Sequence, residues 1–146
     1  MSRLDETRPF IPVRIAVLTV SDTRALADDK SGGLLASRLT EAGHALAERA
    51  IVHDDKAQII AALRAFIQTP DIDCVISTGG TGLTGRDVTP EAFRAVFEKE
   101  IDGFGEIFRF LSFQKIGTST LQSRAVAGVA GGTYLFALPG SPSACK

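Results

Sequence analysis

The chain has 146 residues, of which 23% are charged, and its formal net charge is −1. A chain of this length fits one domain with a sizeable core. The charge balance provides no basic excess for binding a phosphate backbone, and no stretch reaches about 18 consecutive apolar residues, so we expect neither a nucleic-acid partner nor a membrane span.

The N-terminal segment, residues 1–10, reads as an extension that leads to no apolar signal core. We therefore expect a soluble, cytoplasmic protein whose folded domain covers residues 11–146. The two cysteines, Cys74 and Cys145, suit neither a disulfide framework nor a metal-ligand spacing, and zinc is not expected.

A strand, a polar loop and a helix recur in the first half of the chain. Residues 13–20 are nearly all apolar and predict a strand buried on both faces. Leucines at helical spacing then predict a helix that ends before Gly43. Residues 45–52 predict a second strand, followed by a helix that Pro70 ends, and residues 74–77 predict a third, buried strand.

The second half continues this alternation. The run Thr89-Pro90-Glu91 predicts a helix start, with the threonine as N-cap and the proline in the first helical position. Residues 103–113 predict an aromatic-rich helix whose phenylalanines lie in the core or in a subunit interface. Residues 118–130 predict another helix, and residues 133–140 a last strand. The whole pattern implies a three-layer α/β/α domain with a mostly parallel sheet.

Polar loops follow four of the predicted strands. They begin after Val20, Val52, Ser77 and Leu138, and they are the richest parts of the chain in Gly, Ser, Thr and Asp. In open parallel sheets, ligands bind beyond the carboxyl ends of the strands, because loops and helix N-termini meet there. We therefore expect a ligand site at this edge of the sheet.

The loop after Ser77, TGGTGLTGRD, has the composition of an anion cradle. Its glycines allow backbone amides to approach a ligand closely, and Thr78, Thr81 and Thr84 add hydroxyl donors. It contains neither the Gly-Lys-Ser/Thr of a Walker A loop nor the dinucleotide fingerprint. A tight strand-to-helix turn without a ligand is the alternative interpretation.

Two aspartates, Asp54 and Asp87, should reach this edge from different strands. Each has a structural interpretation, as a carboxylate that stabilises a helix start, and we expect Asp54 or Asp55 to cap the helix that follows. Together, Asp54 and Asp87 could hold a magnesium ion through water and an anionic substrate.

Five other residues are candidates for ligand contacts or catalytic bases. Arg24, Arg86 and Arg124 could offset phosphate charge, although a solvated surface position is the alternative for each. His44 and His53 are expected at the ends of elements rather than as catalytic bases.

From about Ile11 onward the sequence resembles the MoaB and MogA molybdopterin-binding family, which is related to the gephyrin G domain. The resemblance rests on five segments in this order: RIAVLTVSD, AIVHDD, STGGTGLTGRDVTPEA, GFGEIFRFLSFQKIGTSTLQSRAVAGVA and FALPGSP. The fourth segment is much closer to the MoaB branch. The resemblance implies a three-layer α/β fold that binds molybdopterin, a pterin dithiolene with a terminal phosphate.

In the adenylyltransferase members, the resemblance further implies transfer of AMP from ATP to that phosphate with magnesium. Asp87 and Asp54 match the family's two functional acids and are expected to act in catalysis and to hold Mg²⁺. The better-known bacterial MoaB pattern lacks the aspartate at the position of Asp54, so keeping both acids favours retained activity. The positions matched to substrate binding are Ser21, Asp22, Thr78, Gly79, Gly80, Thr81, Gly82, Ser119, Pro139, Gly140 and Ser141.

The resemblance also implies a homo-oligomer, a trimer or a hexamer, and makes other cofactor-biosynthesis proteins candidate partners. The family continues after Cys145 into a closing helix, whereas this sequence ends at Lys146. A shortened chain or a covering subunit would account for that difference.

Two alternative functions stay open. One is a non-catalytic molybdopterin-binding or carrier protein, which the MoaB-like second half suggests. The other is a relative with another nucleotide substrate, because the fold also occurs in competence-associated proteins.

Overall fold

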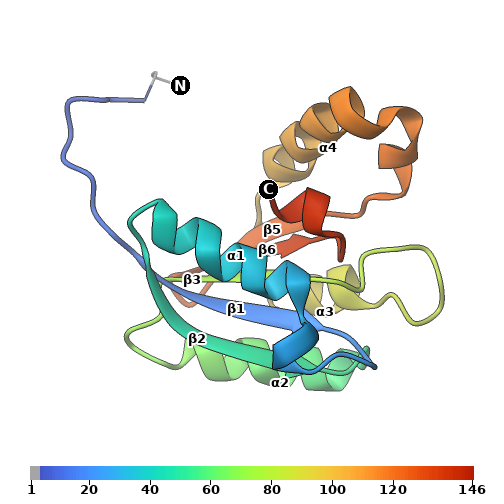
Figure 1. Ribbon diagram of the computed structural model, residues 1–146. Helices are drawn as coiled ribbons and strands as arrows, with labels where there is room; N and C mark the ends of the chain where they lie inside the picture. The colour runs from blue at the N-terminus through green and yellow to red at the C-terminus, as the bar shows by residue number, and fades with distance from the viewer. Residues whose placement is uncertain (1–3) are drawn as a thin grey trace.

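The computed structural model describes residues 4–146, in which a six-stranded sheet carries helices on both faces (Figure 1). The strands are β1 (Arg14–Val20), β2 (Ala45–Val52), β3 (Cys74–Thr78), β4 (Lys99–Glu100), β5 (Val126–Ala130) and β6 (Thr133–Leu138). The α-helices are α1 (Lys30–Glu41), α2 (Lys56–Ile67), α3 (Thr89–Val96) and α4 (Asp102–Ile116). Short 3-10 helices follow at η1 (Leu26–Asp28), η2 (Gly117–Gln122) and η3 (Pro142–Cys145).

The sheet has the strand order β2-β1-β3-β6-β5-β4, and its first four strands run parallel. Strands β5 and β4 pair antiparallel at the other end. Both faces of β1 are covered: Val17 packs in the cluster that contains Leu35 of α1, and Leu18 packs in the cluster that contains Leu63 of α2 and Phe93 of α3. The predicted three-layer α/β fold with a mostly parallel sheet is therefore confirmed.

The helix predicted over residues 118–130 is wrong. Residues 117–122 form the 3-10 helix η2, and Val126–Ala130 form β5. Strand β5 pairs with β6 through Gly131 and Gly132, whose φ angles are +56° and +79°. A Gly-Gly pair with positive φ makes the tight turn of a β-hairpin. The missed signal was this pair of glycines, which places Val126–Ala130 beside β6 as a strand.

Helix α3 starts one residue earlier than predicted. Thr89 is its first helical residue, and the N-cap Val88 makes no side-chain capping bond. The Thr89 hydroxyl instead donates to the carbonyl of Gly79 at 2.9 Å. A tertiary hydrogen bond to the preceding loop has therefore replaced the local cap that the sequence indicated.

Helix α4 projects from the body of the molecule beside η3 (Figure 1). Of its 15 residues only Gly105 is buried. The prediction that its phenylalanines lie in the core is therefore wrong for Phe110 and Phe113, which are 62% and 54% exposed. Across residues 4–146, every helix is too short or too polar to cross a membrane.

The two cysteines lie in the core as free thiols. Cys74 belongs to β3 and Cys145 to η3, and both pack in the cluster on the α1 side of the sheet. Burial raises the pKa of the Cys74 thiol to about 12 and also raises that of Cys145. Both therefore act as small apolar side chains at neutral pH.

Candidate functional site

Two cavities lie next to each other at the carboxyl ends of the parallel strands. The smaller, of about 310 Å³, is lined by the loops that follow β1, β2 and β3. The larger, of about 720 Å³, lies between the loop after β3, helix α4 and the segment after β6. Gly80, Asp87 and Gly140 line both cavities, which therefore share a boundary.

Every residue that the sequence assigned to the site lines one of these cavities. Those of the smaller cavity, besides the shared three, are Ser21, Asp22, Asp54, Thr78 and Gly79. Those of the larger cavity are Thr81, Gly82, Ser119, Pro139 and Ser141. The fold brings most of these residues together because the loops after the parallel strands open at one edge of the sheet, and Ser119 reaches the larger cavity from η2.

The glycine loop, residues 78–82, has a backbone that side chains would obstruct. Gly79 and Gly80 have φ angles of +102° and +71°. A Cβ on Gly79 would lie 2.3 Å from the Val20 carbonyl oxygen, and a Cβ on Gly80 would lie 2.2 Å from Oγ1 of Thr89. Close packing of the strand and helix ends thus explains both glycines without any ligand.

The hydrogen bonds of this loop leave two of its amides available. The carbonyls of Gly79 and Gly80 accept from the hydroxyl and the N–H of Thr89, and the Gly79 N–H donates to the Leu138 carbonyl at 3.0 Å. Among the hydrogen bonds of residues 4–146, none has the N–H of Gly80 or Thr81 as its donor. Neighbouring unpaired amides are typical of an anion-binding loop.

The loop hydroxyls are less available than expected. Thr78 Oγ1 donates to the Pro139 carbonyl at 2.9 Å, and Thr84 Oγ1 donates to Oδ2 of Asp87 at 2.6 Å. Two of the three threonines therefore hold the protein's own loops together. The backbone amides are the main free donors at the boundary between the cavities.

Asp54 lies at the edge of the smaller cavity with other acids around it. Its backbone N–H donates to Oδ1 of Asp22 at 3.0 Å. Burial raises the pKa of the Asp54 carboxyl, and the negative charges of Asp22 and Asp87 raise it further, while Arg86 lowers it. A cation at this position would relieve the repulsion among these carboxylates.

Asp87, at the boundary between the cavities, is held in place as an anion. Its Oδ2 accepts hydrogen bonds from the hydroxyl and, at 3.0 Å, from the backbone N–H of Thr84. These bonds, the hydroxyl's first, lower the pKa of Asp87, and the charge of Arg124 lowers it further. Asp54 and Asp87 are thus two carboxylates in contrasting environments at one edge.

The acids fit a magnesium ion that is only partly enclosed by protein. Among residues 4–146, no group of three His, Cys, Asp or Glu side chains is close enough to form a complete metal site. Mg²⁺ is usually bound by one or two carboxylates and completes its shell with water and substrate phosphates. Asp54, beside the negative charges of Asp22 and Asp87, and Asp87, whose pKa is lowered, meet that requirement.

The arginines and histidines have distinct environments. Arg24 and Arg86 line the smaller cavity, and Nη2 of Arg86 lies 3.4 Å from Oδ2 of Asp22. Arg124 contacts the protein's own carbonyls and Glu91, which overturns its interpretation as a free phosphate-binding group. His44 and His53 flank β2, as predicted.

The aspartate that caps α2 is Asp55, whose Oδ1 accepts from the backbone N–H of Gln58 at 3.0 Å. This leaves the side chain of Asp54, rather than that of Asp55, to line the smaller cavity.

Helix α4 contributes residues that sequence reasoning did not assign to the site. They line the larger cavity and are Phe108, Leu111, Ser112, Lys115 and Ile116. Their spacing of three and four residues places them along one side of the helix, which was the available signal. They give the larger cavity an apolar wall with one ammonium group.

Comparisons with known proteins show the family of this chain. The family model described as "Probable molybdopterin binding domain" matches residues 16–146. Molybdenum cofactor biosynthesis protein B of Escherichia coli (strain K12) is 54% identical over 137 residues, which cover 94% of this chain and 81% of that protein.

Two solved structures share the fold at substantial identity. A crystal structure of a molybdenum cofactor biosynthesis protein B has a TM-score of 0.91 and 46% identity, covering 94% of this chain and 86% of that one. The tungsten cofactor synthesizing protein MoaB from Pyrococcus furiosus has a TM-score of 0.84 and 38% identity, covering 92% and 86%. This chain therefore belongs to the MoaB/MogA family of molybdenum-cofactor biosynthesis proteins and is most similar to its MoaB branch.

Proposed function

We propose that the protein binds molybdopterin and transfers AMP from Mg-ATP to its terminal phosphate. The observation that carries the proposal is the shared boundary of the two cavities at Gly80, Asp87 and Gly140. A transfer between two substrates needs two adjoining compartments whose reacting groups meet. The family membership supports molybdopterin as one of these substrates.

The chemistry asks mainly for positioning and charge neutralisation. An oxygen of the molybdopterin phosphate attacks the α-phosphorus of ATP, the bond to the β-phosphate oxygen breaks, and pyrophosphate leaves. The nucleophile is already an anion, so no general base is needed. The N–H groups of Gly80 and Thr81 donate to the phosphate oxygens, and Arg24 and Arg86 lower the repulsion between the two anionic substrates.

Asp54 and Asp87 are the residues that would hold a magnesium ion. When bound, the ion neutralises charge on the ATP phosphates. The contrasting pKa shifts support this role, because a cation would favour the ionised form of Asp54 while Asp87 is already ionised.

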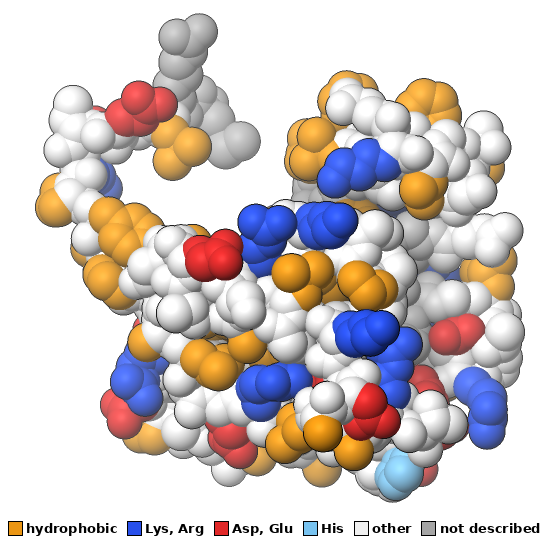
Figure 2. Space-filling view, viewed as in Figure 1, with side chains coloured by type: hydrophobic (Ala, Val, Ile, Leu, Met, Phe, Trp, Pro, Cys, Tyr) orange, Lys and Arg blue, Asp and Glu red, His pale blue; other side chains and the backbone are white. Residues whose placement is uncertain are grey.

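We also propose that the protein acts as a homo-oligomer through α4. The helix is apolar on several sides, as Figure 2 shows for its projecting end, and an isolated helix of that kind is normally covered. Its exposed apolar side chains are Ile107, Phe110, Leu111, Phe113 and Ile116. Leu111 and Ile116 also line the larger cavity, so a second copy on this surface would lie beside the site.

The test of the proposed activity is an assay with purified protein, molybdopterin, ATP and Mg²⁺. We expect adenylylated molybdopterin and pyrophosphate in equal amounts, and a loss of about 10²-fold or more in kcat for Asp87→Asn. The matched control is Asp71→Asn, an exposed aspartate that precedes β3 and lines neither cavity.

The same assay separates the alternatives. Tight molybdopterin binding by the wild-type protein without any product would contradict the enzymatic proposal and favour a carrier. Absence of molybdopterin binding would contradict both and favour another nucleotide substrate.

A further inference from the structure

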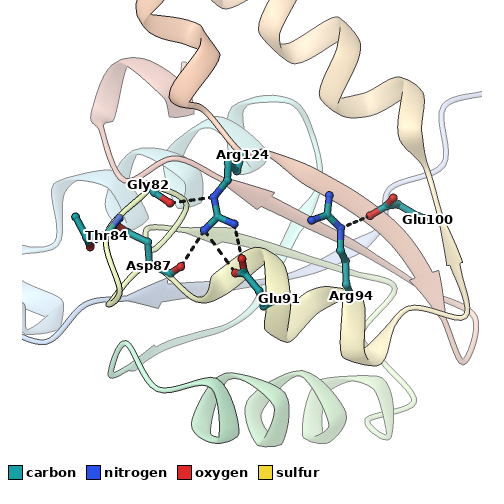
Figure 3. Close-up of polar contacts among 7 residues, drawn as sticks. All are labelled: Gly82, Thr84, Asp87, Glu91, Arg94, Glu100 and Arg124. Carbon is teal, nitrogen blue, oxygen red and sulfur yellow. Dashed lines mark hydrogen bonds and ion pairs between the residues drawn. The ribbon is translucent and has the colours of Figure 1, made fainter.

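Arg124 lies between the site and the antiparallel end of the sheet, directly before β5, and its side chain is 27% exposed. Figure 3 shows its guanidinium pointing back to the loop that joins β3 to α3. Nε donates to the carbonyl of Gly82 at 2.9 Å, and Nη2 donates to the carbonyl of Asp87 at 2.8 Å. One side chain thus binds both ends of the segment 82–87.

The contact needs the fork of a guanidinium. Arg124 donates hydrogen bonds to two loop carbonyls and to the carboxylate of Glu91, which lies on α3. A lysine ammonium is a single compact donor group and cannot reproduce this planar arrangement. The hydrogen bond from Arg124 also lowers the pKa of Glu91, so the carboxylate stays ionised and pairs with the guanidinium.

Within the segment that Arg124 holds, Thr84 and Asp87 are joined to each other by hydrogen bonds. The N–H and hydroxyl of Thr84 both donate to Oδ2 of Asp87, and the Asp87 N–H donates to the Thr84 carbonyl at 3.0 Å. There is little space for rearrangement, since a Cβ on Gly82 would lie 2.7 Å from the same oxygen. Movement of the loop ends would therefore move the Asp87 carboxylate.

From these contacts we infer that Arg124 is a positioning residue, which fixes the 82–87 loop and thereby places the Asp87 carboxylate at the boundary of the two cavities. Its catalytic consequence rests on the proposed adenylyl transfer, but the placement of the loop does not. Arg124 touches no substrate in this role, because it lines neither of the two cavities and its recorded hydrogen bonds go to the protein itself.

A neighbouring ion pair provides the matched control. Nε of Arg94, also on α3, lies 2.8 Å from Oε1 of Glu100, and Figure 3 shows that this pair lies away from the 82–87 loop. Both side chains are partly exposed, at 54% and 36%. Arg94→Gln removes a guanidinium from the same region without touching the loop.

The first experiment measures amide hydrogen exchange of the full chain without ligands. In Arg124→Gln we expect the amides of Thr84 and Asp87 to exchange about tenfold faster or more, with Leu18 in the core unchanged. Arg94→Gln should leave all three rates unchanged. If Arg124→Gln is too unstable to purify, Arg124→Lys serves instead, because it keeps the charge and loses the fork. Unchanged loop exchange in the soluble variant would overturn the inference.

The second experiment is a double-mutant cycle on turnover. Arg124→Gln should lower kcat about 10²-fold with KM changed far less, since misplacing a reacting group by about 1 Å has that effect. In an Asp87→Asn background the same change should cost much less, because the residue it positions is gone. Full additivity would contradict action through Asp87. If the wild type has no turnover, the proposed activity fails while the exchange experiment still decides the role of Arg124.

Discussion

The backbone N–H of Asp54, after β2, donates to the Asp22 carboxylate, after β1, at 3.0 Å. This bond joins the loops of two neighbouring parallel strands and brings their acids together. Asp22 also lies 3.5 Å from Nδ1 of His53 and 3.4 Å from Arg86. Asp22 therefore has the Arg86 guanidinium beside it, whereas burial and two like charges oppose ionisation of Asp54.

Replacing Asp54 should stabilise the folded protein while impairing its activity. Because the pKa of Asp54 is raised in the folded state, its ionised form destabilises that state at neutral pH. Asp54→Asn should raise the free energy of unfolding at pH 7, and the gain should vanish as pH falls below about 4, where the carboxyl is protonated in both states. Urea unfolding at both pH values checks this, with Asp71→Asn as control. A loss of stability at pH 7 would contradict it.

Replacing a glycine by alanine should be costly at Gly80, in the glycine loop, and harmless at Gly85, outside it. Gly80→Ala should lower the free energy of unfolding by about 1–3 kcal/mol, since φ is +71° and the new Cβ meets Thr89. Gly85→Ala has open space around its Cβ and should change stability by less than about 0.5 kcal/mol. Chemical denaturation measures both, and equal effects would rule out the strain that we assign to Gly80.

The ion pair of Glu91 with Arg124 should contribute pH-dependent stability. The pKa of Glu91 is lowered in the folded state, so the contribution is present above the unfolded pKa and is lost as pH falls through the folded pKa. Glu91→Gln should cost up to about 1 kcal/mol at pH 7, since the pair is partly exposed. The cost should shrink toward zero below about pH 4.

The control for this ion pair is Glu48→Gln, because Glu48 is exposed on β2 and has no side-chain hydrogen bond or ion pair with the described residues 4–146. It should show no comparable loss at either pH. A Glu91→Gln cost that is independent of pH would point to packing rather than charge.

A charge on the projecting helix should prevent self-association. Phe110 is 62% exposed on α4, and Phe110→Glu would place a carboxylate within the proposed contact between copies. We expect a monomer in sedimentation analysis where the wild type is an oligomer. Ile11→Glu, at an exposed apolar residue just after the N-terminal segment, should keep the wild-type assembly.

The sequence by itself determined the parallel part of the fold. The apolar run of β1 requires cover on both faces, and Pro70 and Gly43 mark helix ends through restrictions of their own backbones. The four polar loops and their common edge followed from that topology, whereas the individual site residues followed from the family resemblance. These features depend on local chemistry and on a periodic pattern, which are both readable along the chain.

Only the tertiary structure decided how the loop residues are used. Thr89 binds Gly79 rather than its own helix, Arg124 holds the 82–87 loop from the segment that precedes β5, and residues 126–130 become a strand because β6 pairs with them. Each of these outcomes depends on a partner that is distant in sequence, or on which of several possible acceptors a donor binds. Local propensity cannot rank such alternatives, because their free energies differ by contacts that exist only once the chain has folded.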